Sequence, residues 1–262
     1  MKASGEVTAE LERIKILAGD NVGIVERAKI RLLSREVEGQ KNIEAIADSA
    51  LKSLPDSVSD QPVADDWKRK FFLEAEDICD EDLQFLWGKV LAGEVVSPGS
   101  YSLRTLEILK NLSKHEAELF RSACNLAFSD GWIMKGTQDT ANEFNNYGLS
   151  YDDILSLRDA GLIHEGDQLT KNFKDIDTLP SIVFVNNGLT IELSGELPQT
   201  LNLPCIVFTR AGMELKNLIE NNLCMPYLQS IATLLRQRGI TVKKGTIKIS
   251  GSIVFRNFDE DL

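Results

Sequence analysis

Residues 82–125 constrain the fold most strongly, because their apolar side chains recur with a helical period. Between Leu83 and Leu91, five apolar residues fall at i, i+3, i+4, i+7 and i+8, which places them on one helix face. Asp80 precedes this run as the predicted N-cap, and the helix is expected to end near Gly93. A helix with one apolar face buries it against other elements, so the pattern predicts a packed helical core.

Two more helices are expected in the same stretch. The Pro-Gly pair at residues 98–99 marks a turn, and either Ser100 or Ser102 is expected to cap a leucine-rich helix. Ser113 and Glu116 have the spacing of a capping box, which predicts the start of a third helix. Three amphipathic helices with short connections favour a hairpin-type bundle.

The motif order in this region also carries a resemblance. The run LWGKVLAGEV, followed by PGSYSLRTLEILKNLS and EAELF, resembles an uncharacterised bacterial family known only as a domain of unknown function. More loosely, the layout is similar to the abortive infection alpha family, in which a helix ending in Leu-Ala precedes a Leu-rich helix and a Leu-Ser-x-x-Glu-Ala start. The closer resemblance covers about residues 35–130. It implies a bacterial or mobile-element protein with a link to phage defence, and it supplies no catalytic residues.

Composition limits the broad class of protein. The chain has 262 residues, enough for one large or two ordinary domains, and it is 43% hydrophobic and 26% charged, as soluble globular chains are. Its net charge of −11 argues against a strong general affinity for nucleic acid or anionic membranes. The apolar runs are far shorter than the roughly 20 residues of a membrane span. No apolar signal region opens the sequence, so a cytoplasmic protein without a membrane span is predicted.

The sequence predicts an α+β protein with an all-helical N-terminal bundle and a mixed α+β C-terminal domain. We expect a helical segment at 1–60, a helical bundle core at 61–130, and the α+β domain at 131–262. The stretch between Pro55 and Pro62 is expected to link helices, and Asp65-Asp66 to cap the next one.

The C-terminal domain is expected to have winged-helix-like features. Ser150 starts a short helix that reaches Gly161, and AGLIHEGDQLT has the polar turn that joins two strands in such units. Asn186-Asn187-Gly188 is a hairpin signal. Further expected elements are strands at 181–185, 189–193 and 205–209, helices at 211–221 and 226–238, and closing strands in TVKKGTIKIS and SIVFRNF.

No pattern in the chain predicts catalysis, so we expect neither an enzyme nor a cofactor or metal site. The four cysteines are widely spaced without a CxxC, which favours buried free thiols over a disulfide framework or a zinc site. The two histidines, His115 and His164, lack the partners that HExxH or a hydrolytic triad requires. An acidic cluster offers the oxygen ligands that Mg²⁺ or Mn²⁺ prefers, although a solvated helix face that runs into helix-start charges is the favoured explanation. Its members are Glu74, Glu76, Asp77, Asp80, Glu81 and Asp82.

The connection after the first central helix is the candidate interaction surface. It combines a turn with several capping side chains, and Glu94 and Arg104 are expected to pair across it. The alternative is that this hairpin only fixes how two helices cross. The interaction candidates are Gly93, Glu94, Pro98, Gly99, Ser100, Ser102, Arg104 and Thr105.

Two groups of basic residues are candidate phosphate contacts. Arg27, Lys29, Arg31 and Arg35 share one predicted helix. The C-terminal candidates for nucleic-acid contact are Arg236, Arg238, Lys243, Lys244 and Lys248. Surface lysines are more often simply solvated, and winged helices also serve as protein contacts.

Three functional hypotheses follow. The first is a non-enzymatic interaction protein with an unidentified protein partner, acting as a sensor or effector partner in abortive phage defence. The second is a nucleic-acid-binding regulator that uses the C-terminal domain. The third is a metal-dependent nuclease that uses the acidic cluster. The amphipathic N-terminal helices suit a homo-oligomer as well as an intramolecular bundle.

Overall fold

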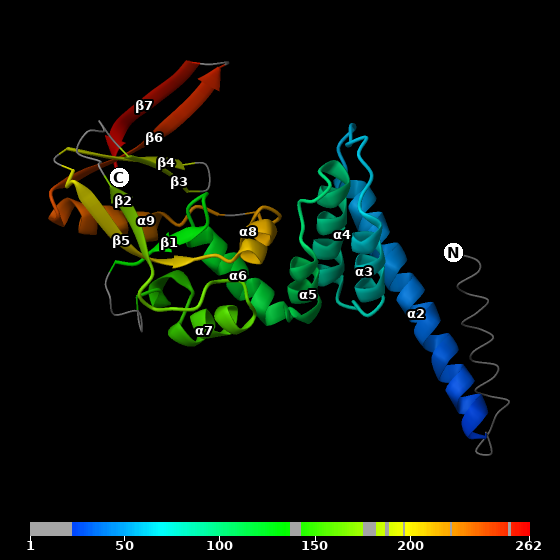
Figure 1. Cartoon of the computed structure of the whole chain (residues 1–262). Coiled ribbons are helices and arrows are strands. Elements are labelled where there is room, and N and C mark those ends of the chain that lie inside the picture. The colour runs from blue at the N-terminus through cyan, green and yellow to red at the C-terminus, as the bar shows by residue number, and fades with distance from the viewer. Residues whose placement is uncertain are drawn as a thin grey trace. The chain divides into compact units, whose positions relative to one another are not determined.

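The computed structural model describes residues 23–136, 143–174, 182–186, 189–195, 197–220, 222–250 and 253–262. Its elements are helices and antiparallel strands, so the predicted α+β class is confirmed at that level (Figure 1). The described residues form two compact units that meet in sequence at Lys110 and Asn111. The sequence had instead suggested divisions near residues 60 and 130. No helix in the described ranges is long and apolar enough to cross a membrane.

Unit 1 is built from helices. They are α2 (Ile24–Ser53), α3 (Asp65–Ala75), α4 (Glu81–Val96) and α5 (Leu103–Asn111), the last of which ends at the unit boundary. Figure 1 shows α3 and α4 lying beside α2. A Cβ at Gly88 of α4 would lie 2.5 Å from Oγ of Ser49, so α2 and α4 approach as closely as a glycine permits.

The core of unit 1 is aromatic. The Trp67 and Phe71 rings stack with centroids 5.0 Å apart, and Phe71 lies 5.1 Å from the Trp87 ring. All three side chains are buried. Aromatic pairs at this spacing contribute beyond the area they bury, so this row is expected to hold α3 against α4.

The helix starts of unit 1 test the predicted caps. Asp80 caps α4 as predicted, because its Oδ1 accepts hydrogen bonds from the amides of Asp82 and Leu83. The predicted cap at Asp65-Asp66 is wrong: α3 begins at Asp65 itself, with Ala64 as N-cap and no side-chain cap. Both aspartates therefore lie in the first turn, where their charge favours the positive helix end. Helix α4 also continues beyond the predicted end at Gly93, to Val96.

In unit 2, helices alternate with strands along the sequence. Its helices are α6 (Lys114–Leu126), the 3-10 turn η2 (Asn145–Tyr147), α7 (Tyr151–Asp159), α8 (Arg210–Lys216) and α9 (Met225–Gln237). Its strands are β1 (Trp132–Met134), β2 (Thr170–Lys174), β3 (Ile182–Asn186), β4 (Leu189–Gly195), β5 (Thr200–Val207), β6 (Ile240–Ser250) and β7 (Ile253–Asp261). The capping box at Ser113 and Glu116 is confirmed at the start of α6.

The strands of unit 2 form two antiparallel sheets. One has the order β1-β5-β2 and the other the order β3-β4-β6-β7. Along the chain, β3 and β4 therefore lie between β2 and β5, which are neighbours in the first sheet. Strand β5 begins at Thr200, earlier than the predicted 205–209, because Pro204 does not interrupt it. The carbonyl of Pro204 accepts the Lys135 amide at 2.7 Å. Of the predicted hairpin residues, Asn187 and Gly188 lie outside the described residues.

Helix α8 is shorter than predicted. It ends at Lys216, whereas the sequence predicted a helix over 211–221. The amides of Leu218 and Ile219 bond the carbonyls three residues earlier, so the chain tightens out of the α-helix there. Helix α9 matches its predicted range to within one residue at each end.

Candidate functional site

The connection between α4 and α5 is a compact turn. Gly99 has φ +90°, a conformation that favours glycine. The backbone amide and the hydroxyl of Ser100 both donate to the carbonyl of Ser97, at 3.1 and 2.6 Å. The turn predicted from Pro98-Gly99 is therefore confirmed.

Glu94 holds this turn from inside. Its side chain is 2% exposed, and its two carboxylate oxygens accept the amides of Gly99 at 2.7 Å and Tyr101 at 3.0 Å. Hydrogen bonds to a carboxylate are stronger than neutral ones, and buried amides left unbonded are costly. The carboxylate thus bonds backbone amides where the sequence predicted an ion pair with Arg104, whose side chain is exposed.

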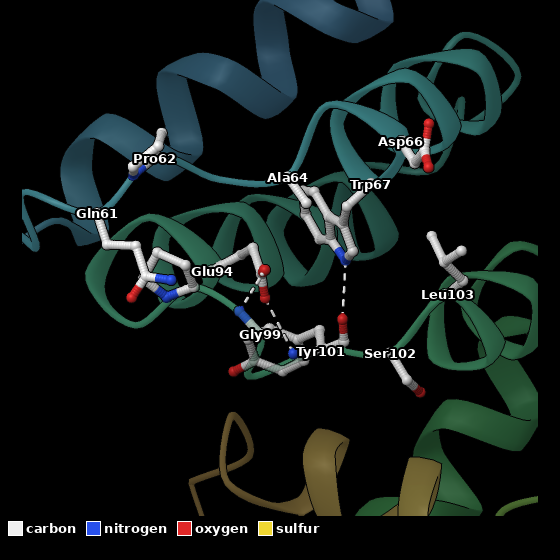
Figure 2. A pocket seen from close by; sticks show the side chains of 11 residues that line it. Gln61, Pro62, Ala64, Asp66, Trp67, Glu94, Gly99, Tyr101, Ser102 and Leu103 are labelled. Atoms are coloured by element: carbon white, nitrogen blue, oxygen red, sulfur yellow. Dashed lines mark hydrogen bonds between the residues drawn. The ribbon is translucent and has the colours of Figure 1, made fainter.

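Tyr101 joins the turn to helices α3 and α4. Its carbonyl accepts a 2.8 Å hydrogen bond from the indole Nε1 of Trp67. Its ring packs over Gly93, where a Cβ would lie 2.7 Å from ring atom Cε2. Gly93 is therefore the residue that admits the Tyr101 ring, and Figure 2 shows the bonds that Trp67 and Glu94 make to this loop.

A surface cavity of about 380 Å³ opens between α3, the end of α4 and this turn. We call it the Trp67 pocket (Figure 2). It is lined by Gln61, Pro62, Ala64, Asp66, Trp67, Glu94, Pro98, Gly99, Tyr101, Ser102 and Leu103. Most of this lining is apolar or aromatic, as in sites that bind another molecule by shape.

The structure brings together part of the predicted interaction surface. Glu94, Pro98, Gly99 and Ser102 line the Trp67 pocket, and Gly93 supports it through Tyr101. Three other candidates do not line it. Ser100 closes the turn, Arg104 is exposed, and Thr105 is buried with its hydroxyl 2.9 Å from that of Ser102.

Sequence reasoning missed Trp67, Tyr101 and the linker residues Gln61 and Pro62. In the sequence, Trp67 falls at helical spacing with Phe71, Ala75 and Ile78, which predicts only a core residue on one helix face. The hydrogen bond between Trp67 and Tyr101 joins positions 34 residues apart, so no local pattern marks it. The aromatic residue inside the turn motif, Tyr101, was the signal available.

Three polar side chains of the pocket, those of Glu94, Trp67 and Ser102, have partners within the chain. Glu94 accepts two amides and the Trp67 indole donates to a carbonyl. The hydroxyl of Ser102 lies 2.9 Å from that of Thr105. The lining contains no histidine, cysteine or lysine, so a nucleophile paired with a base is not formed by these residues.

The acidic cluster is distributed among separate structural roles. The Glu74 carboxylate lies between the ammonium groups of Lys70, at 2.8 Å, and Lys110. Burial alone raises the pKa of the Glu74 carboxyl, but the hydrogen bonds from Lys110 and Lys70 outweigh it and hold the pKa below its ordinary value. Asp80 caps α4, and Asp77 lies 3.7 Å from Arg35. Across the described ranges, no group of three His, Cys, Asp or Glu residues is placed to hold a metal ion.

Two lysines are buried among the described residues of unit 2, Lys135 and Lys216, and both lie outside the predicted sites. Lys135 is 2% exposed, and its Nζ donates to the backbone carbonyl of Asp167. Burial lowers its pKa, while the nearby carboxylates of Asp167 and Glu143 oppose the shift. The Asp167 carboxylate also lies 2.7 Å from the Arg158 guanidinium.

The cysteines are only partly buried. Cys124 and Cys205 are buried as predicted, and burial raises the pKa of both thiols. Cys79 is exposed and Cys224 is half-buried, so the prediction is wrong for Cys79. The reason is its place in the connection between α3 and α4, which lies at the surface.

The C-terminal basic candidates do not form one uniform group. Arg236 lies at the end of α9, where its Nη2 donates to the carbonyl of Val242 at 3.1 Å. Arg238 follows α9, and Lys243, Lys244 and Lys248 lie on β6. The strand register places acidic residues directly opposite two of the lysines. These pairs are Lys243 with Glu192 and Asp261, and Lys244 with Glu260.

Comparison with known proteins gives one family. The model described as "Protein of unknown function (DUF2806)" matches residues 26–232. The match includes the Trp67 pocket and the β1-β5-β2 sheet, and it ends within α9. Comparison with the curated proteins gave no match. Comparison with solved structures gave no match either.

Proposed function

Because the chain belongs to the DUF2806 family of proteins of unknown function, we propose its function from its own geometry. It is a non-enzymatic interaction protein that docks a protein partner at the Trp67 pocket. The observation that carries this proposal is the preformed apolar lining, in which Glu94 and Trp67 are already bonded to the turn. A site that is ordered before binding loses less conformational entropy when the partner docks.

The size of the pocket fits the docking of an anchor side chain. Its volume of about 380 Å³ lies at the small end of the usual range for ligand sites. Protein interfaces commonly depend on a few anchor side chains that fill such pockets. The pocket therefore suits one or two side chains of a partner better than a large substrate.

The biological setting is proposed from the resemblance alone. The layout of a helix ending in Leu-Ala, a Leu-rich helix and a Leu-Ser-x-x-Glu-Ala start is loosely similar to that of the abortive infection alpha family. We therefore place the protein in the bacterial cytoplasm, as a sensor or effector partner in phage defence. Its partner would then be a component of the same response.

A capture experiment tests the docking function. Leu103 lines the pocket and is 45% exposed, so Leu103→Lys is expected to block docking without unfolding α5. The matched control is Leu73→Lys on α3, where the leucine is 59% exposed and does not line the pocket. Tagged chains are purified from the native host, with and without phage infection. We expect one protein at equal stoichiometry with the wild type and Leu73→Lys, and its loss with Leu103→Lys.

Equal recovery of every co-purifying protein by all three chains would contradict docking at the pocket. A phage plating assay on cells that carry each variant tests the biological setting separately. Protection lost with Leu103→Lys and kept with Leu73→Lys is the expected result. Unchanged plating in cells lacking the protein would remove the link to phage defence.

The second candidate function is nucleic-acid binding by unit 2. The observation in its favour is the topology of that unit. The chain order α6, β1, α7, β2, β5 with the sheet order β1-β5-β2 supports the winged-helix-like interpretation. In helix-turn-helix proteins, the second helix of the motif enters the major groove. Here the corresponding helix is α7, and its charged residues argue against phosphate contact. They are Asp152, Asp153, Arg158 and Asp159, of which Arg158 pairs with Asp167.

Nucleic-acid binding would therefore depend on the β6 lysines. It predicts that the chain binds random duplex DNA or RNA at low salt. The double variant Lys243→Gln/Lys244→Gln should bind more weakly, and the slope of its log affinity against log salt concentration should be smaller by about 1–2. Filter-binding titrations at salt concentrations from low to physiological measure both the affinity and its salt dependence. Absence of binding at low salt would remove this candidate.

A further inference from the structure

The charges of the Trp67 pocket have one sign. Its lining contains two carboxylates, Asp66 and Glu94, and no lysine, arginine or histidine. Glu94 is buried at the turn, and Asp66 is exposed in the first turn of α3. In the view of Figure 2, the Trp67 ring lies between these two carboxylates. A cationic group entering the pocket would meet no like charge among the lining residues.

The walls of the pocket suit a long side chain with a charged end. Trp67 and Tyr101 provide aromatic surface, and Leu103 and Pro98 provide aliphatic surface. Lysine and arginine bury their aliphatic stems along apolar surface while their charged heads stay near water or a counter-charge. Aromatic rings also attract such cations. The exposed carboxylate of Asp66 supplies a counter-charge at the edge of the site.

We infer that the Trp67 pocket binds a lysine or arginine side chain of a partner peptide, with its aliphatic stem against Trp67 and Leu103 and its cationic head at Asp66. This inference rests on the proposed docking function and names the chemistry of its partner. The net charge of −11 favours encounter with a basic partner in the same sense. A purely apolar anchor is the competing occupant, and the test separates the two.

The chain offers a matched pair of aspartates for the test. Asp65 and Asp66 are adjacent and exposed, and both lie in the first turn of α3. Only Asp66 lines the pocket, whereas Asp65 pairs with Lys68 at 2.7 Å. The variants Asp66→Asn and Asp65→Asn therefore remove the same charge near the same helix end. Gln61→Lys adds a cation at the exposed pocket rim without touching a helix.

The experiment selects ligands for the full chain from a random dodecapeptide library displayed on yeast, and then measures their affinities by calorimetry. We expect the selected peptides to share a lysine or arginine whose change to norleucine weakens binding by about tenfold. Asp66→Asn and Gln61→Lys should each weaken the same peptides by about fivefold, more strongly at low salt. Asp65→Asn should stay within about twofold of the wild type, because its charge is screened and lies outside the pocket. Circular dichroism confirms that each variant is folded.

The remaining outcomes overturn one or both claims. Selected peptides that share an apolar residue, lose binding with Leu103→Lys and bind Asp66→Asn as well as Asp65→Asn would overturn the basic anchor and leave the docking function intact. Peptides that bind Leu103→Lys as tightly as the wild type would overturn docking at the pocket itself. A library that yields no peptide sensitive to any pocket variant would overturn both.

Discussion

The two units bury charged groups in different ways. In unit 1, Glu74 is 4% exposed and lies between two lysine ammonium groups whose side chains still reach solvent. In unit 2, Lys135 is 2% exposed and donates to a backbone carbonyl, with carboxylates only nearby. The pKa of both groups is lowered. For the acid this means that the fold favours the charged form, and for the lysine it means that the fold disfavours it.

The contrast shows that the partner, and not burial alone, decides whether a charge stabilises a fold. Glu74 of α3 pairs with Lys70 on its own helix and joins α3 to α5 through Lys110. It therefore helps to hold the helices on which the Trp67 pocket is built. Lys135 provides no comparable ion-paired link, so its replacement is expected to be tolerated much better.

The largest expected effect is the loss of both partners of Glu74. In Lys70→Met/Lys110→Met the carboxylate stays buried without a cation, and we expect the free energy of unfolding to fall by about 3–5 kcal/mol. Urea denaturation followed by circular dichroism measures the loss, and hydrogen exchange of α3 and α5 peptides assigns it to unit 1. Lys70→Met alone serves as control, because Lys110 remains, and should cost much less. An equal loss of unfolding free energy in the single and double variants would contradict the claim that a remaining cation keeps the buried Glu74 carboxylate stabilising.

A smaller effect is expected when a methyl group is added in the core of unit 1. It tests whether the stability of unit 1 depends on close packing as well as on the ion pairs of Glu74. Gly93→Ala forces the Tyr101 ring aside and is expected to lower stability by about 1–3 kcal/mol. Combining it with Tyr101→Leu should cost less than the sum of the two single changes, because the clash is relieved. Strict additivity in denaturation experiments would show that the ring can move without cost.

The pH dependence of stability should differ between the units. The folded pKa of Glu74 is below its ordinary value of 4.5, so its contribution is present above that value and is lost as pH falls through the folded pKa. The folded pKa of Lys135 is below 10.5, so the unfolded state binds more protons between the two values, and stability rises with pH there. Hydrogen exchange of each unit across both pH windows checks this. Glu74→Gln should reduce the pH dependence of stability in the acid range alone. Lys135→Met should reduce it in the alkaline range alone.

The smallest expected effect is that of Lys135→Met near neutral pH. The change loses one hydrogen bond to the Asp167 carbonyl but removes a buried ammonium group, so stability should change by less than about 1 kcal/mol. Thermal unfolding compares it with the wild type. A loss as large as that of the lysine pair in unit 1 would show that Lys135 stabilises the fold through its charge.

Local signals in the sequence predicted much of the fold. Asp80 and the Ser113 capping box were identified because a cap depends on residues two or three positions away. The end of α8 and the start of β5 were missed because packing and strand pairing override local signals there. The predicted strand began at residue 205, yet the preceding Pro204 lies within β5 and its carbonyl accepts the amide of Lys135.

The candidate site was only partly predictable. Four of its lining residues came from the turn motif, and they are Glu94, Pro98, Gly99 and Ser102. The sequence paired Glu94 with Arg104 across the turn, whereas the folded turn presents two amides to the carboxylate. Trp67 could not be placed in the site, because its contact with Tyr101 exists only after α3 packs beside the turn.

The indole of Trp67 gives the pocket an optical reporter of its own. Trp87 and Trp132 are buried elsewhere, so Trp87→Phe/Trp132→Phe leaves Trp67, at the pocket wall, as the single tryptophan. Its Nε1 is tied to the Tyr101 carbonyl, which couples its emission to the geometry of the turn. An occupant that changes this geometry should change the emission. Occupancy could then be followed in the unlabelled chain, before any partner has been identified.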